Sequence, residues 1–191
     1  MPRHRRILRL LAALAVCGVL VLSACSSSSG GKDFSFTSKN KRGTLISESK
    51  RKPAQDIGGE LISSGKRVTL AANKGHVTVL NFFASWCSPC KVETPQLDLF
   101  YRQMKTKGLH FIGFDTHDDK GAGKAFIAQN DISFPVVFDQ ESEVQLKLGN
   151  IPGVLPFTVL VDKQGRVAAV YIDKLTPKDL QGPVDTLLAE R

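Results

Sequence analysis

The sequence predicts an α/β domain with a central mixed β-sheet and helices on both faces. Two largely apolar runs, 77–83 (apolar apart from Thr78 and Asn81) and 109–114, are typical of strands that are buried on both sides. A segment of helical character follows each of them, which favours parallel strands joined by crossover helices. Two further runs, 157–161 and 166–172, flank Asp162-Lys163-Gln164-Gly165, a turn that is typical of an antiparallel hairpin. A parallel core extended by a hairpin makes a mixed sheet.

The first half of the domain is predicted to hold an additional hairpin and one long helix. Residues 57–62 and 67–70 indicate two short strands around Ser63-Ser64-Gly65, which form an extra N-terminal β-hairpin. After the strand at 77–83, residues 88–106 are typical of a helix. Its apolar side chains recur at helical spacing, at Val92, Leu97, Phe100, Tyr101 and Met104.

The second half alternates strands and helices. After the strand at 109–114, a glycine-rich start at Lys120-Gly121-Ala122-Gly123 leads into a helix that reaches about residue 130. Residues 135–138 are expected to form a short strand. Residues 141–148 are expected to form a short helix that ends at Gly149, because glycine readily adopts the left-handed conformation that terminates helices.

A final helix is predicted from its N-terminal signals. Thr176 is followed by Pro177, and Asp179 stands three residues after Thr176, which indicates a partial capping box with proline at the first helical position. Pro183 lies inside this segment. Because proline lacks the N–H that an interior helix position needs, we expect Pro183 to kink or restart the helix.

The N-terminus indicates a targeting segment. Four arginines precede an apolar stretch, 10–22, and Leu22-Ser23-Ala24-Cys25 follows, which is the pattern of an export signal. The Leu-Ser-Ala-Cys sequence resembles the signal of bacterial lipoproteins, in which the cysteine is lipidated and becomes the first mature residue. The prediction is a lipoprotein signal peptide at 1–24. The alternatives are ordinary cleavage and an uncleaved membrane anchor, for which the apolar run is short.

Residues 25–53 are predicted to form a lipidated, flexible, basic tether, and residues 54–191 the folded domain. Residues 26–53 carry seven basic and two acidic side chains, whereas residues 54–191 carry 15 basic and 16 acidic ones. The net charge of +8 therefore comes from the N-terminal part of the chain. Such a tether fits an anionic membrane surface or a solvated linker. The domain has no basic patch with interleaved aromatics, which argues against a nucleic-acid partner.

The cysteines point to thiol chemistry. Cys17 belongs to the signal peptide and Cys25 is the lipidation candidate, so Cys87 and Cys90 are the only thiols left in the domain. They form a C-x-x-C pair between an apolar strand and a helix. The unpaired N–H groups and the positive dipole at a helix N-terminus favour a thiolate there. A thiolate with a second thiol one turn away can attack a disulfide and then resolve the mixed disulfide.

The spacing assigns different tasks to the two sulfurs and their neighbours. Cys87, at the strand–helix junction, is the candidate nucleophile and is expected to be the more exposed sulfur. Cys90, one turn into the helix, is expected to be shielded and to resolve the mixed disulfide. Pro89 suits the first helical turn, where its missing N–H would be unpaired in any case. Trp86 is predicted to cover the sulfur, to pack in the core, or to do both.

Other uses of a C-x-x-C pair fit the sequence poorly. A zinc site needs two more ligands, and the histidines of the domain show no ligand spacing. Covalent haem attachment needs a histidine directly after the second cysteine, where Lys91 stands. The prediction is therefore a redox pair without a metal and without a bound cofactor.

Two further residues are candidates with open alternatives. Glu93 lies one helical turn after Cys90 and either accepts the proton of that thiol or is a surface glutamate that interacts with the helix dipole. Pro156 directly precedes a predicted strand, where a cis-proline could place a backbone edge beside the cysteines. Position alone does not establish this, and Pro152 is a competing candidate.

Two segments resemble TlpA/ResA-like thiol-disulfide oxidoreductases, which are thioredoxin-superfamily proteins outside the cytoplasm. The segment at 79–95 is similar to the active-site stretch of that family, and the segment at 153–162 is similar to its cis-proline stretch. The resemblance implies a thioredoxin-like fold with Cys87 as the attacking and Cys90 as the resolving cysteine. It implies a cis bond at Pro156. It also implies that Glu93 handles protons, since Asn81 replaces the buried aspartate of cytoplasmic thioredoxins.

The expected function is that of a lipid-anchored, extracytoplasmic thiol-disulfide oxidoreductase at the cell membrane. Its expected partners are protein disulfides or dithiols and a transmembrane thiol-disulfide electron carrier. The resemblance suggests a reductant in cytochrome c maturation, with apocytochrome c as a substrate. The alternatives are an oxidant that introduces disulfides into exported proteins, a peroxide-reducing redoxin and a non-catalytic binding module.

Overall fold

The computed structural model describes residues 43–148 and 153–191. The predicted signal peptide, the lipidation candidate Cys25 and most of the tether lie outside the described residues. So do Gly149, the predicted end of a helix, and Pro152, the competitor of Pro156.

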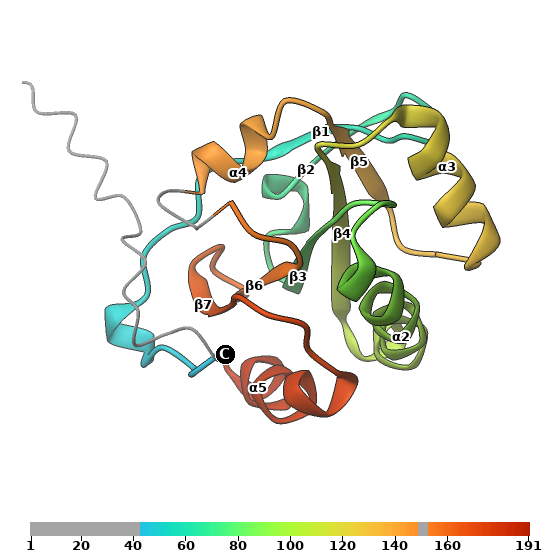
Figure 1. Cartoon of the computed structure of the whole chain (residues 1–191). Coiled ribbons are helices and arrows are strands. Elements are labelled where there is room, and N and C mark those ends of the chain that lie inside the picture. The colour runs from blue at the N-terminus through green and yellow to red at the C-terminus, as the bar shows by residue number, and fades with distance from the viewer. Residues whose placement is uncertain (1–42, 149–152) are drawn as a thin grey trace, which may run out of the picture. The chain divides into compact units, whose positions relative to one another are not determined.

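The centre of the domain is a five-stranded mixed sheet with the strand order β5-β4-β3-β6-β7 (Figure 1). Strands β3, β4 and β5 are parallel, and β6 runs antiparallel to both β3 and β7. The mixed sheet predicted from the sequence is confirmed. The strands are β3 (Val77–Phe83), β4 (Leu109–Thr116), β5 (Val136–Asp139), β6 (Phe157–Val161) and β7 (Val167–Tyr171).

Strand β3 is the central strand, and all seven of its residues are buried. Successive side chains of a strand point to opposite faces of the sheet. On one face, the ring of Phe82 stacks on those of Phe114 and Phe157, with centroids 4.6 and 4.0 Å apart. On the other face lie Asn81 and Phe83. Asn81 is therefore a polar residue on the face that packs against the cysteine-bearing helix.

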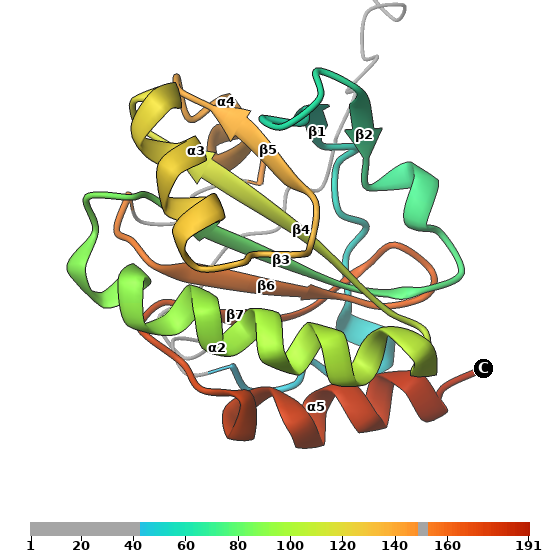
Figure 2. The same ribbon diagram turned by 90° about the vertical axis from the view of Figure 1, so that its right-hand side faces the viewer.

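Helices cover both faces of the sheet, as predicted. The apolar side chains of three helices share one cluster with Cys87 and Cys90, and α4 packs on the opposite cluster (Figure 2). The predicted apolar face of the cysteine-bearing helix is correct at Leu97 but wrong at Val92, which is half exposed. The helices are α2 (Ser88–Met104), α3 (Lys120–Gln129), α4 (Glu143–Lys147) and α5 (Pro177–Ala189).

The predicted N-terminal hairpin is present. Strands β1 (Gly58–Glu60) and β2 (Arg67–Thr69) pair antiparallel, and a bridge between Leu61 and Val137 connects this hairpin to β5. Three short 3₁₀ turns complete the described elements, at η2 (Glu48–Lys50), η3 (Ala71–Asn73) and η4 (Lys105–Lys107).

The folded part of the chain begins earlier than the predicted boundary at residue 54. The N–H of Gly43 donates to the carbonyl of Val170 at 3.1 Å, and the N–H of Val167 donates to the carbonyl of Lys52 at 2.8 Å. Residues 43–53, which we call the N-terminal segment, thus lie along β7. Their basic, polar composition predicted a solvated linker. The prediction failed because Arg51 is neutralised by acidic residues that are distant in the sequence.

The guanidinium of Arg51 is buried among four oxygen atoms from three residues. It donates to Asp162 at 3.1 Å, to the two carboxylate oxygens of Glu190 at 2.6 and 2.8 Å and to the carbonyl of Ile46 at 2.9 Å. Glu190 directly follows α5, so this ion pair connects both ends of the described domain. A buried charge needs such partners, because its desolvation is otherwise too costly.

Helix α5 is continuous through Pro183, so the expected restart is wrong. The carbonyl four residues before Pro183 belongs to Asp179, and the hydroxyl of Tyr171 donates to it at 3.4 Å. This contact replaces the helix bond that proline cannot donate. The predicted capping interaction is also present, since the Asp179 carboxylate accepts from the N–H of Thr176 at 2.7 Å.

Candidate active site

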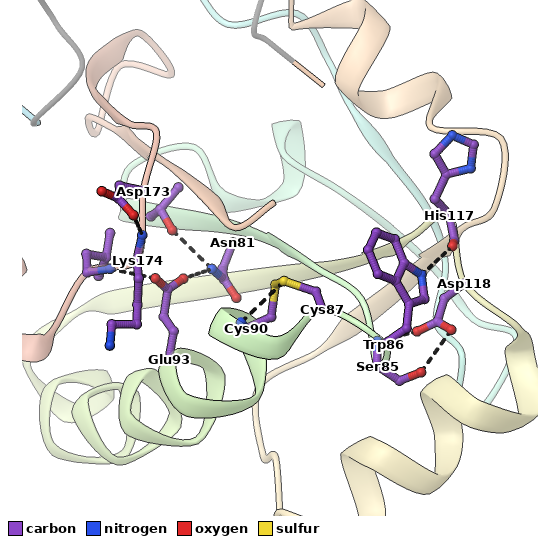
Figure 3. Close-up of a disulfide and its surroundings, with 12 residues drawn as sticks. Asn81, Ser85, Trp86, Cys87, Cys90, Glu93, His117, Asp118, Asp173 and Lys174 are labelled. Atoms are coloured by element: carbon purple, nitrogen blue, oxygen red, sulfur yellow. Dashed lines mark hydrogen bonds between the residues drawn. A yellow bond between two sulfur atoms is a disulfide. The ribbon is translucent and has the colours of Figure 1, made fainter. Parts of the chain in front are cut away.

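The two cysteines form a disulfide at the start of α2 (Figure 3). Cys87 is the N-cap residue, and its Sγ accepts a hydrogen bond from the N–H of Cys90 at 3.3 Å. The Cα atoms of the pair are 5.2 Å apart. The sulfur of Cys87 therefore acts as the hydrogen-bond acceptor that the N-terminus of a helix needs. The same N–H group and the helix dipole favour a negative charge on this sulfur.

Both cysteines are buried in the oxidised form. Cys87 is 3% exposed and Cys90 is 0% exposed, so the predicted difference between them is small here. The residues between them, Ser88 and Pro89, are exposed and lie in the first turn of α2. Of the two cysteines, only Cys87 keeps any exposed area in this form.

Glu93 is buried rather than on the surface, with 1% of its area exposed. Its Oε1 accepts from the amide of Asn81 at 2.9 Å, and its Oε2 accepts from the N–H of Leu175 at 2.6 Å. Burial raises the pKa of Glu93 to about 7, although both hydrogen bonds act in the opposite direction. A carboxyl with this pKa can bind or release a proton near neutral pH.

Asn81 connects Glu93 to the strand that follows the cis-proline. Its Nδ2 donates to Glu93 and, at 3.0 Å, to Oγ1 of Thr158 on β6. Its Oδ1 is buried and has no hydrogen-bond partner within the described part of the chain. In Figure 3, Asn81 lies between the carboxyl of Glu93 and the disulfide. Asn81 therefore fixes the position of Glu93 and leaves an unused acceptor in the same region.

The peptide bond between Leu155 and Pro156 is cis, which is the geometry that the resemblance implies. Pro156 is buried and directly precedes β6, whose first residue, Phe157, pairs with Phe82. Strand β3 ends one residue later and leads into Cys87. Pro156 and the disulfide therefore lie at the same end of the sheet.

Trp86 does not pack in the core. Its side chain is 60% exposed, and its indole N–H donates to the carbonyl of His117 at 2.8 Å (Figure 3). Of the two predicted alternatives, core packing is therefore wrong. The indole lies at the surface against the loop after β4.

That loop contains functional candidates that the sequence reasoning missed. The carboxylate of Asp118 accepts from the backbone N–H of Ser85 and, at 2.9 Å, from its hydroxyl. Nearby, Asp115 at the end of β4 is fully buried, and burial raises its pKa to about 8. One signal was available, because polar residues at the carboxyl ends of neighbouring parallel strands often form sites.

The described residues show neither a metal site nor a membrane span. Within residues 43–148 and 153–191, no three His, Cys, Asp or Glu side chains are grouped in a way that could hold a metal ion. No helix in the same ranges combines the length and the apolar composition that crossing a bilayer requires.

A mixed sheet with a disulfide at the N-terminus of a packed helix and a cis-proline at the same sheet end defines a thiol-disulfide oxidoreductase with a thioredoxin-like fold. A family model described as Redoxin matches residues 49–187. The chain belongs to the redoxin family, and within the thioredoxin superfamily it is ResA-like.

Curated relatives support this assignment. The chain is 35% identical to "Thiol-disulfide oxidoreductase ResA" of Bacillus cereus over 119 residues, which are 62% of this chain and 67% of the relative. It is 28% identical to the protein of the same name from Bacillus thuringiensis over 181 residues, which are 95% of each chain.

Solved structures give the same fold. A DsbF homologue from Corynebacterium diphtheriae matches with a TM-score of 0.75 and 31% identity, over 81% of this chain and 99% of that chain. A secreted thiol-disulfide isomerase from Corynebacterium glutamicum matches with a TM-score of 0.77 and 27% identity, over 83% and 98% of the two chains.

Proposed function

We propose that this oxidoreductase is tethered to the outer face of the cell membrane, with Cys87 as its nucleophile and Cys90 as its resolving thiol. The observation that supports these roles is the position of Cys87 as the N-cap of α2, with its sulfur accepting a backbone N–H. The lipoprotein-like sequence that ends at Cys25 supports the tether. The secreted relative from Corynebacterium glutamicum supports a location outside the cytoplasm.

The reaction is two successive thiol-disulfide exchanges. The Cys87 thiolate attacks one sulfur of a substrate disulfide, forms a mixed disulfide and releases the other sulfur as a thiolate. The Cys90 thiol loses its proton, and its thiolate attacks Cys87 and releases the second substrate sulfur. The products are a substrate dithiol and the Cys87–Cys90 disulfide. Glu93 is the proton acceptor for Cys90, since its pKa of about 7 suits a neutral medium.

The proposed direction is reduction, with apocytochrome c as the substrate class and a transmembrane thiol-disulfide carrier as the electron donor. Support for this direction comes from the similarity to ResA proteins. Pro156 is proposed to present its backbone edge to the substrate, because it lies at the same sheet end as the disulfide.

The equilibrium potential of the Cys87–Cys90 pair against glutathione tests the direction. We expect a value near that of cytoplasmic thioredoxin, about −270 mV. A value near that of the strong periplasmic oxidant DsbA, about −120 mV, would reject the reductant and support an enzyme that introduces disulfides.

Two variants test the enzyme and the tether separately. Cys87→Ala should abolish the reduction of a model disulfide such as that of insulin; a variant with unchanged activity would indicate a different nucleophile. Cys25→Ser should release the protein from the membrane fraction of the producing cell. If the unaltered protein is itself found in the soluble fraction, the tether is wrong while the oxidoreductase assignment stands.

A further inference from the structure

A groove of about 650 Å³ runs along the first half of β4. One wall comes from β2 and η3 and the other from the end of α2 and η4 (Figure 2). Val68 on the first wall packs on one core cluster and Tyr101 on the second wall packs on the other, so the walls belong to opposite faces of the sheet. The groove therefore follows the edge of β4 rather than a face of the sheet.

The groove lies at the end of the sheet away from the disulfide. Leu109, the first residue of β4, is paired with Val77, the first residue of the parallel strand β3. Cys87 follows the other end of β3. An occupant of the groove would therefore leave the Cys87–Cys90 disulfide open to a substrate.

Within the described ranges, no strand pairs with the first half of β4 on the side of the groove. Strand β5 pairs with β4 only from Gly113 onward. The N–H of Gly113 donates to the carbonyl of Pro135 at 2.8 Å, so the backbone groups of Gly113 point toward β5. Because successive residues of a strand alternate in direction, the backbone groups of Leu109 and Phe111 point to the same side, into the groove.

The sequence before β5 explains why the pairing stops at Gly113. The next bond of a parallel ladder would run from the N–H of residue 135 to the carbonyl of Phe111, and Pro135 has no N–H. Two residues earlier, the N–H and hydroxyl of Ser133 donate to Asp98 of α2 at 2.6 and 2.8 Å. The chain therefore runs toward α2 and enters the sheet only beyond the groove.

The outer strands of the sheet, in contrast, are covered by other parts of the chain. The N-terminal segment lies along β7. Beyond β5, the N–H of Ile62 donates to the carbonyl of Val136 at 2.9 Å, and Leu61 forms a bridge with Val137. Open strand edges readily accept another chain, and folded proteins usually cover them. Among the residues that the structure describes, the first half of β4 is thus a place where the central sheet can take up a further strand.

The groove is basic on both walls. No acidic side chain lines it, whereas Arg67 on β2, Lys105 on η4 and His110 on β4 do. Arg67 and Lys105 are exposed, and neither takes part in a salt bridge among the described residues. The side chains of an added strand would alternate between the two walls, so acidic side chains on either side would meet a base.

We propose that this groove binds an extended, acidic segment of another protein, which adds to β4 as a strand beside Leu109 and Phe111. Backbone hydrogen bonds to the open edge hold the segment, and its carboxylates pair with Arg67 and Lys105. The proposal does not depend on the thiol chemistry, since the groove and the disulfide lie at opposite ends of the sheet.

Two other occupants match the charge of the groove poorly. Residues 26–42 of the chain itself carry four basic side chains and one acidic one, so the basic walls repel them. A second copy that paired β4 with β4 would bring the basic walls of both copies together. An acidic partner has no such conflict.

Binding of a short labelled peptide tests the proposal. The peptide alternates pairs of glutamates with pairs of valines, which places carboxylates on both sides of an extended strand. Fluorescence anisotropy with the full chain in its oxidised form should show saturable binding that weakens as salt is added. A peptide with lysine in place of glutamate is the control and should bind at least about tenfold more weakly. No saturable binding of the acidic peptide up to about 1 mM would overturn the proposal.

Charge reversal distinguishes the groove from the overall charge of the protein. The double variant Arg67→Glu/Lys105→Glu should bind the acidic peptide at least about tenfold more weakly. Lys124→Glu/Lys178→Glu makes the same change in net charge at exposed positions outside the groove, and its affinity should stay within about twofold of that of the unaltered protein. Equal losses for the two double variants would mean that the peptide responds to net charge alone, and the groove would be wrong.

Filling the groove tests its location without a change in charge. Ala72 is exposed and lines the groove, whereas its neighbour Ala71 is exposed and does not. Ala72→Trp should therefore block the peptide, and Ala71→Trp should bind it as the unaltered protein does. Unchanged affinity in Ala72→Trp would place the binding site elsewhere.

Hydrogen exchange tests the added strand itself. The bound peptide should slow the exchange of the N–H groups of Leu109 and Phe111, and binding without this protection would rule out strand addition. Arg67→Glu/Lys105→Glu should reduce insulin at the rate of the unaltered protein, and a loss of this activity would contradict the separation of the groove from the active site. If the unaltered protein binds the peptide but does not reduce insulin, the proposed function fails and the groove stands. Sedimentation that shows a dimer of the unaltered protein but a monomer of this variant would identify a second copy as the occupant and overturn the proposal.

Discussion

At the scale of single residues, the two cysteines differ because of their places on α2. Cys87 is the N-cap and receives the N–H of Cys90 on its sulfur, while Cys90 lies one turn further in and is fully buried. Partial positive charge at the helix N-terminus stabilises a thiolate on Cys87. With a spacing of three residues, the sulfur of Cys87 can attack a substrate disulfide and the sulfur of Cys90 can then form the intramolecular disulfide.

This difference predicts that Cys90→Ser traps a mixed disulfide. With the resolving thiol removed, reduced Cys90→Ser should form a stable adduct with oxidised glutathione at Cys87, which mass spectrometry detects as an added glutathione. Cys87→Ser is the control and should form little or no adduct, because Cys90 is buried in the first turn. Faster adduct formation by Cys87→Ser would reverse the two assignments.

There is a physical reason why the sequence revealed Glu93 but not Asp118. Glu93 is one helical turn from Cys90, so its proximity follows from local geometry. Asp118 reaches Ser85 across 33 positions of the sequence, from a different loop. No periodicity encodes such a contact. Local spacing also left the burial of Glu93 open, because that burial depends on Leu175, which precedes α5.

The raised pKa of Glu93 predicts a pH-dependent stability that Glu93→Gln loses. A carboxyl whose pKa is higher in the folded state contributes its full stabilisation below its unfolded pKa of about 4.5 and loses it as the pH rises through about 7. Relative to the unaltered protein, Glu93→Gln should therefore gain stability as the pH rises. The change between about pH 4 and about pH 8 is at most roughly 3 kcal/mol.

Urea unfolding of the two oxidised proteins at a series of pH values measures this difference. Comparison at each pH cancels the other titrating groups, including Asp115, whose raised pKa acts in the same direction in both proteins. A stability difference that does not depend on pH would mean that Glu93 titrates at its ordinary value and is not suited to accept the Cys90 proton.

At the scale of elements, close packing of α3 on β4 limits what Gly123 can become. Gly123→Ala would place a Cβ 1.9 Å from Oδ2 and 2.9 Å from Cγ of the buried Asp115, so this side chain or the helix must shift. We expect a loss of about 1–3 kcal/mol in the free energy of unfolding, as for other overpacked interiors. Gly121→Ala in the same helix is the matched control and should cost much less, since its nearest neighbour is the side-chain oxygen of Asp119 at 3.1 Å. Thermal denaturation compares the two variants.

Most elements could be predicted because their signals are local. Strand β3 has the predicted bounds, since a largely apolar run flanked by turns specifies a buried strand. The break expected at Pro183 was wrong because the compensation comes from Tyr171 on β7, outside the helix. Apolar periodicity also could not show that Val92 faces solvent, because the sequence of a helix does not say which other elements pack against it.

At the scale of the whole domain, Arg51 connects the N-terminal segment to the end of α5. Arg51→Ala would leave Asp162 and Glu190 without their buried partner. We expect a loss of about 3–5 kcal/mol, the usual effect of removing one member of a buried ion pair. Arg166→Ala is the control, because Arg166 also binds Asp162 but is partly exposed, and it should cost about 1 kcal/mol. If urea unfolding gave similar losses in the free energy of unfolding for both variants, Arg51 would contribute no more than an ordinary surface charge.

The same contacts predict where the chain can be shortened. Removing residues 1–42 keeps every backbone bond to β7 that the structure describes, from Gly43 onward, so we expect the melting temperature of the domain to stay nearly unchanged. Removing residues 1–53 should lower it by many degrees, because the ion pairs of Arg51 and the hydrogen bond between Lys52 and Val167 are lost together. Composition placed the boundary at residue 54, because the charge of Arg51 is matched by residues more than 100 positions away. Equal melting temperatures for the two truncated proteins would restore that boundary and make residues 43–53 part of the tether.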